Sequence, residues 1–232
     1  MTIAEPALTG PRHAPSSGQT KSLVILLHGY GADGNDLIGL AEPLSQYMPD
    51  TAFRAPNAPD RCSVNPMGYQ WFPIPHMDGC TEEQARASLV TSAEKLNGFL
   101  DAKLAEMASE RTVLVGFSQG TMMSLHVTPR REAPVAGVVG FSGRLLVPER
   151  LEAEAVSRPP MLLIHGDQDP MVPHGSMAEA AAALRAAGFA VATHTSEGVG
   201  HSIAPDGLGL ALGFIAQVLG IRLPGQDESP GG

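Results

Sequence analysis

The sequence predicts an α/β fold with a mostly parallel central sheet and helices on both of its faces. Continuous apolar runs of strand length, such as residues 22–27 and 160–165, are typical of strands buried on both faces. Stretches with helical spacing alternate with these runs, which is the order that a parallel sheet requires. No internal repeat or break in composition divides the 232 residues, so we expect one domain.

The predicted strands, in chain order, are an edge strand near residues 7–10 and strands at 22–27, 52–55, 111–117, 135–141, 160–165 and 190–195. The predicted helices are residues 36–47, 81–107, 119–127, 176–187 and 208–219. In the longest helix, apolar residues recur three and four positions apart, and Thr81 with Gln84 forms a capping box at its start. Residues 56–79 show no convincing secondary structure, and a loop of that length is usually functional or disordered.

The domain is expected to span residues 20–222, between a flexible lead-in at 1–19 and a flexible tail at 223–232. The N-terminus lacks the apolar region of a secretory signal. No apolar run approaches the roughly 20 residues that a membrane-spanning helix needs. We therefore expect a cytoplasmic protein with no membrane span.

The charge balance argues against two classes of partner. Fifteen Lys and Arg against 24 Asp and Glu give a net charge of −9, whereas nucleic acid and anionic lipid both require a basic face. The two cysteines, Cys62 and Cys80, are expected to be free thiols rather than a disulfide in a reducing compartment.

The segment Gly116 to Gly120 has the pattern G-x-S-x-G, with Ser118 at its centre. It lies between a predicted buried strand and a predicted helix, which is the setting of a nucleophile elbow. The glycines are needed because a β-carbon on either flank would collide with the neighbouring strand or helix. We interpret Ser118 as a nucleophile; the alternative is a glycine-rich turn with a capping serine.

An elbow serine requires an acid and then a histidine later in the chain. Asp167 and Asp169 both follow the strand at 160–165, and we favour Asp169 because Asp167 is placed to cap the turn. His201 lies in a glycine-flanked loop between the last strand and the last helix, and the other seven histidines fail on order or context. In this interpretation His201 is the general base and Asp169 fixes its tautomer, while a surface loop histidine is the alternative.

The oxyanion hole is expected to use two backbone amides. One belongs to Gln119, directly after the nucleophile, and the other to Tyr30 in the glycine-rich loop at 28–34. A phosphate-binding turn is the alternative for this loop, but no phosphate-loop or dinucleotide pattern supports it. No spacing typical of metal ligands appears either.

The chain resembles the phospholipase/carboxylesterase branch of the α/β-hydrolases, which includes small carboxylesterases and acyl-protein thioesterases. The matching segments are LLHGYGADGNDL (26–37), APNAP (55–59), WF (71–72), GFSQG (116–120), FSG (141–143), HGDQDPMVP (165–173) and GVGHSI (198–203). The resemblance implies the α/β-hydrolase fold, the triad Ser118, Asp169 and His201, and the amides of Tyr30 and Gln119. It also implies acyl ester or thioester substrates, no cofactor, and a monomer or homodimer. Pro73 departs from the aspartate that the family often has after Trp-Phe.

An aromatic cluster in the long loop predicts a substrate groove beside Ser118. Aromatic side chains on a loop favour a pocket wall over bulk water. The proposed lining residues are Tyr69, Trp71, Phe72, Leu145, Leu146, Met171 and Val172. The alternative is that they only seal the edge of the core.

The sequence thus predicts a serine carboxylesterase for small to medium acyl esters, with no separate lid domain. Alternatives within the same chemistry are a lysophospholipase and an acyl-protein thioesterase. A catalytically inactive hydrolase scaffold that binds a ligand is a different class, and the complete set of Ser118, Asp169 and His201 argues against it.

Overall fold

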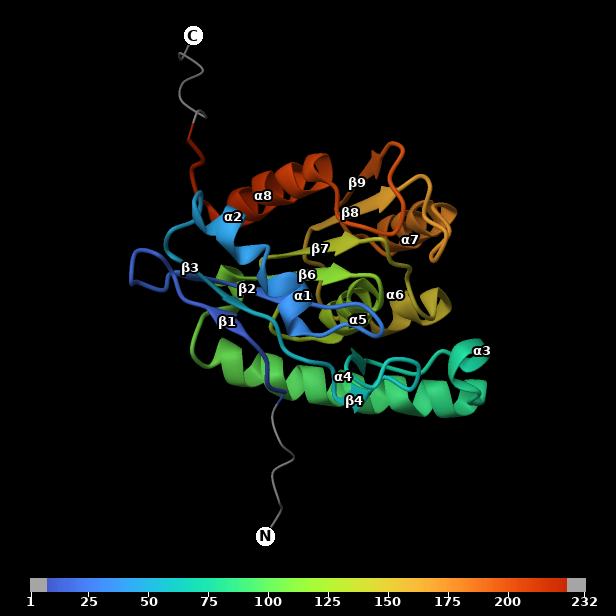
Figure 1. Cartoon of the computed structure of the whole chain (residues 1–232). Coiled ribbons are helices and arrows are strands. Elements are labelled where there is room, and N and C mark those ends of the chain that lie inside the picture. Colours follow the sequence, from blue (N-terminus) through green and yellow to red (C-terminus); the bar gives the residue numbers. More distant parts are fainter. Residues whose placement is uncertain (1–7, 225–232) are drawn as a thin grey trace.

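A computed structural model describes residues 8–224, and its centre is a seven-stranded sheet (Figure 1). The strand order is β1-β3-β2-β6-β7-β8-β9, parallel throughout except for the antiparallel edge pair β1 and β3. The strands are β1 Arg12–His13, β2 Ser22–Leu27, β3 Thr51–Arg54, β6 Thr112–Phe117, β7 Gly137–Phe141, β8 Met161–Gly166 and β9 Val191–Ser196. The predicted α/β class is confirmed.

Helices cover both faces of this sheet (Figure 1). The α-helices are α1 Gly34–Ile38, α2 Ala41–Ser45, α3 Pro75–Asp78, α4 Glu82–Leu104, α5 Gln119–Val127, α6 Leu151–Glu154, α7 Gly175–Ala186 and α8 Pro205–Leu219. Alternate residues of β2 face opposite layers: Val24 and Leu26 pack with α1, α2 and α8, whereas Ile25 and Leu27 pack with α4, α5 and α7. Burial on both faces explains why the central strands are apolar throughout.

Several element boundaries differ from the sequence-based expectation. The helix expected at 36–47 is divided into α1 and α2, since Pro43 cannot donate a hydrogen bond to the carbonyl four residues earlier. The capping box of Thr81 and Gln84 is present, but α4 ends at Leu104. The segment 56–79 contains two short strands, β4 Asp60–Arg61 and β5 Tyr69–Gln70, besides α3. Elements this short carry no hydrophobic period, so a pattern search misses them.

The N-terminal edge strand lies at Arg12–His13, later than the range expected near residues 7–10. Its partners are Arg54 and Phe53, and the Asn57 amide donates to the Thr9 carbonyl at 2.8 Å. Residues 8–13 therefore pack on the domain. Most of the tail expected at 223–232 lies outside the described residues, as do residues 1–7 of the lead-in.

Two smaller expectations concern the thiols and the membrane. Cys62 and Cys80 are both free thiols, as predicted. Within residues 8–224, none of the helices has the length and apolar character needed to cross a membrane.

The parallel strands bring distant segments to one edge of the sheet. The carboxyl ends of β2, β6, β7, β8 and β9 all lie at the right-hand edge in Figure 1. Loops after parallel strands are where open α/β folds place their ligands. The predicted catalytic segments follow β2, β6, β8 and β9, so they meet at this edge.

Candidate active site

Ser118 stands in a strained turn between β6 and α5. Its backbone has φ 53° and ψ −114°, a combination that non-glycine residues rarely adopt. A β-carbon at Gly116 would lie 2.4 Å from the Thr121 nitrogen, and one at Gly120 would lie 1.9 Å from the Leu27 carbonyl oxygen. These contacts give the steric reason for both glycines of the elbow motif.

Neighbouring strands hold this turn in place. The Ser118 amide donates to the Phe141 carbonyl at the end of β7, at 2.8 Å. The Ser118 carbonyl accepts from the Met122 amide, which ties the serine to the first turn of α5. The serine is 8% exposed, so its side chain lies at the bottom of the site rather than on a protruding loop.

Asp169 and His201 are in direct contact across the loops that follow β8 and β9. His201 Nδ1 lies 2.7 Å from Asp169 Oδ2. Gly166 at the end of β8 permits this approach, because a β-carbon there would lie 2.2 Å from the Val199 carbonyl oxygen. The carboxylate can only accept, so His201 Nδ1 carries the hydrogen and Nε2 keeps its lone pair.

Asp167 has a different partner. Its Oδ1 accepts from the Gly198 amide at 2.7 Å, which joins the acid loop to the loop that carries His201. The sequence predicts that Asp167 caps the turn after its own strand, whereas its side chain bonds to a loop 31 residues further along the chain.

The Asp169 carboxylate is buried, and burial acts to raise its pKa. Hydrogen bonds from His201 and from the amides of Val172 and Met171 act in the opposite direction and outweigh burial, so the pKa is lowered overall. Asp169 is therefore a stable anion at neutral pH.

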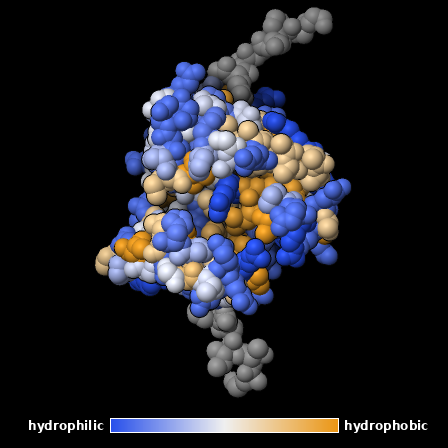
Figure 2. Space-filling model, turned by 90° about the vertical axis from the view of Figure 1, so that its right-hand side faces the viewer, coloured by the Kyte–Doolittle hydropathy of each residue, from blue (hydrophilic) through white to orange (hydrophobic). Residues whose placement is uncertain are grey.

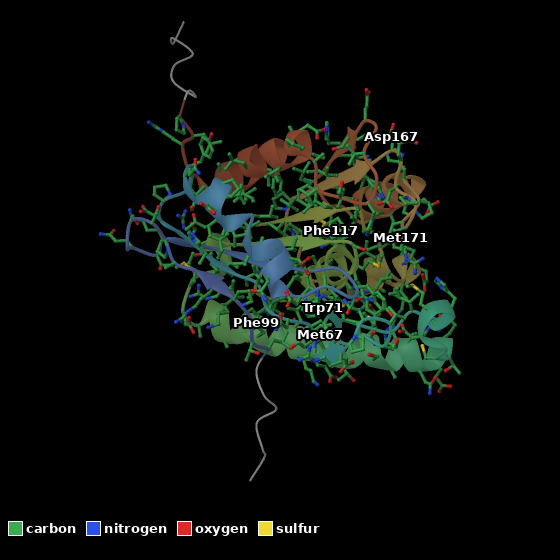
Figure 3. All side chains as sticks on the ribbon, in the orientation of Figure 1. Met67, Trp71, Phe99, Phe117, Asp167 and Met171 are labelled. Atoms are coloured by element: carbon green, nitrogen blue, oxygen red, sulfur yellow. The ribbon has the colours of Figure 1, made fainter. Side chains whose placement is uncertain are left out.

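The His201 ring packs against Phe117, with 4.8 Å between the ring centroids. Because Phe117 precedes Ser118 directly, this contact brings the loop that carries His201 against the segment that carries Ser118. Figure 3 shows Phe117 near the same edge of the sheet as Met171 and Asp167.

The loop after β2 packs directly on Ser118. A β-carbon at Gly29 would lie 3.3 Å from the Ser118 Cβ. Buried His28 accepts from the Ala58 amide through Nε2, at 2.9 Å, and its Nδ1 lies 2.8 Å from the Gly29 carbonyl oxygen. Nδ1 therefore donates, and this bond fixes the peptide whose N–H belongs to Tyr30. Burial lowers the pKa of His28, which keeps the ring neutral.

The Tyr30 side chain connects this loop to α3, a contact that the sequence did not reveal. Its hydroxyl donates to Asp78 Oδ1 at 2.5 Å, and the same carboxylate accepts from the Ser63 hydroxyl and the Ile74 amide. Burial and the hydrogen bond to Asp78 raise the pKa of Tyr30, so the phenol remains a donor.

Gln119 also has a side-chain role that sequence reasoning missed. Its Oε1 accepts from the Trp71 amide at 2.8 Å, and its Nε2 donates to the Phe72 carbonyl at 2.6 Å. Among residues 8–224, neither the Gln119 nor the Tyr30 backbone amide donates to a backbone carbonyl outside the regular helices and strands.

The predicted groove residues fall into two groups. Trp71 has no exposed surface and its indole donates to the His28 carbonyl at 3.0 Å, while Phe72 is also buried. Tyr69 is half-buried, with the Arg61 guanidinium 4.2 Å above its ring centroid. Trp71 and Phe72 are therefore buried supports of the loop after β2 and of Gln119, and they are not exposed walls of a groove.

The four residues of the second group differ in exposure. Met171 is 62% exposed, and the Val172 side chain beneath it is buried. Leu145 and Leu146 line a hollow of about 340 Å³ between the loop after β7 and the first turns of α7, and the same hollow is lined by the polar residues Arg144, Ser176 and Glu179. Figure 2, which faces the carboxyl edge of the sheet, shows a hollowed hydrophobic area at the centre of this face.

Comparison with known proteins agrees with this architecture. A crystal structure of esterase PE8 superposes with a TM-score of 0.84 and 43% identity, covering 92% of this chain and all of that one. Acyl-protein thioesterase 1 of Gibberella zeae is 29% identical over 88% of this chain and 94% of its own length. Esterase YpfH of Escherichia coli is 29% identical over 83% of this chain and 81% of its own. The family model for phospholipase/carboxylesterase matches residues 11–219, and the chain belongs to that family.

Proposed function

We propose that the chain is a serine carboxylesterase that hydrolyses small to medium acyl esters through an acyl-enzyme intermediate. The observation that carries this proposal is the strained Ser118 at the edge where His201 Nδ1 lies 2.7 Å from Asp169 Oδ2. Membership of the phospholipase/carboxylesterase family supports the same reaction class.

In the proposed mechanism His201 Nε2 accepts the Ser118 hydroxyl proton while the serine oxygen attacks the ester carbonyl. Asp169 stabilises the imidazolium that forms, and His201 then protonates the departing alcohol. Water then attacks the acyl-enzyme while His201 takes a proton from it. The protonated His201 returns that proton to the Ser118 oxygen as the carboxylic acid is released. Each step uses only side chains of this chain, an ester and water.

The negative charge that develops on the carbonyl oxygen requires donors. The Gln119 amide at the N-terminus of α5 and the Tyr30 amide are the proposed donors, because both lie beside Ser118 and neither has a backbone acceptor among the described residues. His28 and the bond between Tyr30 and Asp78 hold the second donor from two sides.

The acyl or alcohol part of the substrate is proposed to lie on Met171 and in the hollow lined by Leu145 and Leu146. Tyr69, Trp71 and Phe72 act in this proposal by fixing the loops around the groove. An acyl thioester is a second candidate substrate, supported by the acyl-protein thioesterases among the relatives.

The test is acyl-enzyme formation on a p-nitrophenyl ester. Wild-type protein is expected to give a burst of p-nitrophenol equal to the enzyme concentration, and Ser118→Ala is expected to lose both burst and turnover by at least about 1000-fold. Activity that survives Ser118→Ala would refute the mechanism. A panel of oxygen esters and thioesters of graded chain length then separates the two substrate candidates.

A further inference from the structure

His165 is a buried histidine that the proposed reaction does not use. It lies in β8, on the side of the strand that Met161 and Leu163 present to the α7 layer. Its side chain is 1% exposed. An aliphatic residue would fit the pattern of this face, and burying an imidazole there is unfavourable unless its N–H finds an acceptor.

The acceptors of the His165 ring belong to the acid loop. His165 Nε2 lies 2.9 Å from the Val172 carbonyl oxygen and 3.2 Å from Asp169 Oδ2. Both oxygens can only accept, so Nε2 carries the hydrogen. The Asp169 oxygen that His165 approaches is the one that His201 Nδ1 contacts at 2.7 Å.

These contacts close the acid loop from both sides. The Met171 and Val172 amides donate to Asp169 Oδ1, at 2.8 and 2.9 Å. The His165 ring donates a hydrogen bond to the Val172 carbonyl from the core side of the turn. The Asp169 side chain is consequently fixed through both of its oxygens and through the backbone of the turn that follows it.

The charge state of His165 is compatible with a permanent donor. Burial lowers its pKa; the hydrogen bond to Val172 and the charge of Asp169 oppose this, while His174 and His201 reinforce it. The net pKa is lowered, so the ring stays neutral at the pH where an esterase works. It therefore offers Asp169 a fixed N–H dipole without a competing full charge.

We propose that His165 is a positioning residue for catalysis, which holds Asp169 in the orientation that His201 requires by fixing the turn through Val172. This inference rests on the proposed function, in which His201 is the base. It assigns the histidine of the segment HGDQDP a role separate from the strand packing of its neighbours.

The test compares His165→Gln with His165→Asn, using an ester series to obtain kcat and KM. The Gln amide extends to about the position of Nε2 and can donate to Val172, whereas the shorter Asn amide cannot. We expect Asn to lower kcat by about 10-fold or more with KM changed less than about 2-fold, and Gln to recover most of kcat. Equal kcat for the two variants would overturn the proposal, and this comparison avoids an apolar replacement that could prevent folding.

His174 provides a matched control. Its ring lies 5.8 Å from that of His165, and its Nε2 lies 3.0 Å from the Thr195 hydroxyl rather than near Asp169. We expect His174→Gln to keep kcat within about 2-fold. A loss of kcat equal to that of His165→Asn would show that His165 and His174 contribute only to packing.

A spectroscopic measurement separates positioning from stability. In a proton NMR spectrum, the proton between His201 Nδ1 and Asp169 should give a downfield resonance, and His201→Ala should remove it. His165→Asn is expected to shift or broaden that resonance, and an unchanged resonance would overturn the proposal. If Ser118→Ala retained activity, the proposed function would fail by itself, whatever the His165 variants show.

Discussion

At the scale of single residues, two aspartates two positions apart have different partners. Asp167 accepts from the Gly198 backbone, and Asp169 lies 2.7 Å from His201. Both residues help to join the acid loop to the His201 loop, but only the second contacts an imidazole of the proposed triad. Their order in the sequence predicts that Asp167, which lies nearer the strand, caps its own turn. The structure instead uses Asp167 to join two loops.

Tyr30 shows how a residue chosen for its amide can also act through its side chain. Tyr30→Phe removes the hydrogen bond to Asp78 and leaves the backbone donor in the chain. We expect a loss of about 1–2 kcal/mol in the free energy of unfolding, because Asp78 loses a donor to a charged acceptor. We also expect a several-fold lower kcat, because the loop that carries the proposed oxyanion donor Tyr30 is no longer attached to α3.

Urea denaturation and ester kinetics measure these two effects. Tyr47→Phe is the matched control, since Tyr47 is 45% exposed and lies away from the site loops. If Tyr30→Phe had the stability and kcat of the control, the connection between Tyr30 and Asp78 would have no functional weight.

At the scale of elements, the segment from Pro56 to Gly79 supports the site rather than simply covering it. Trp71 lies in the core between the short strand β5 and α3 of this segment. The Trp71 amide and the Phe72 carbonyl both form hydrogen bonds with the Gln119 side chain. Ser92 of α4 donates to the Trp71 carbonyl from the other side. The segment thereby connects α4 to the start of α5, directly after Ser118.

Trp71 and Met171 should consequently respond differently to substitution. Trp71→Phe is expected to cost about 1–3 kcal/mol of stability and to slow esters of every chain length by the same factor, because the side chain is buried. Met171→Ser should change stability by less than about 0.5 kcal/mol. It should lower the ratio of long-chain to short-chain kcat/KM by about 2- to 5-fold, since less apolar surface meets the acyl chain.

The measurement is kcat/KM over esters of two to ten carbons, with thermal unfolding in parallel. A chain-length effect confined to Trp71→Phe would reverse the assignment of these two residues.

At the scale of the whole molecule, packing helices on both faces of one sheet buries a titratable side chain. The free energy of unfolding therefore becomes sensitive to acid. Burial, with a contribution from the Arg130 charge, lowers the pKa of His126 from its ordinary 6.5 to about 4. Between these two values the unfolded chain binds a proton that the folded chain does not. The stability that depends on neutral His126 is therefore complete above pH 6.5 and is lost as the pH falls to about 4.

His126→Leu should flatten this part of the stability profile by about 2–3 kcal/mol. The difference between the two pKa values corresponds to about 3.4 kcal/mol, and solvent screening of the partly exposed ring reduces it. Urea denaturation at intervals between pH 7 and pH 4 measures the slope. A profile for His126→Leu that parallels the wild type would show that His126 is not the group responsible.

The sequence by itself determined the layers of the fold and the type of chemistry. Buried strands, amphipathic helices and the elbow glycines are recognisable because each depends on contacts within a few residues or on a repeating pattern. The elbow glycines meet backbone atoms at distances that allow no β-carbon, so local sterics fixed their identity.

Tertiary structure decided which of these residues meet. From the sequence, His165 is predicted only as the end of a strand, but in the structure its ring holds the turn after Asp169. Gln119 is predicted only as the first residue of a helix, but its side chain binds the backbone of Trp71. The bond between Trp71 and Gln119 and the bond between Tyr30 and Asp78 each join residues that lie 48 positions apart in the chain. Such contacts depend on how strands are ordered in the sheet, and no local pattern records that order.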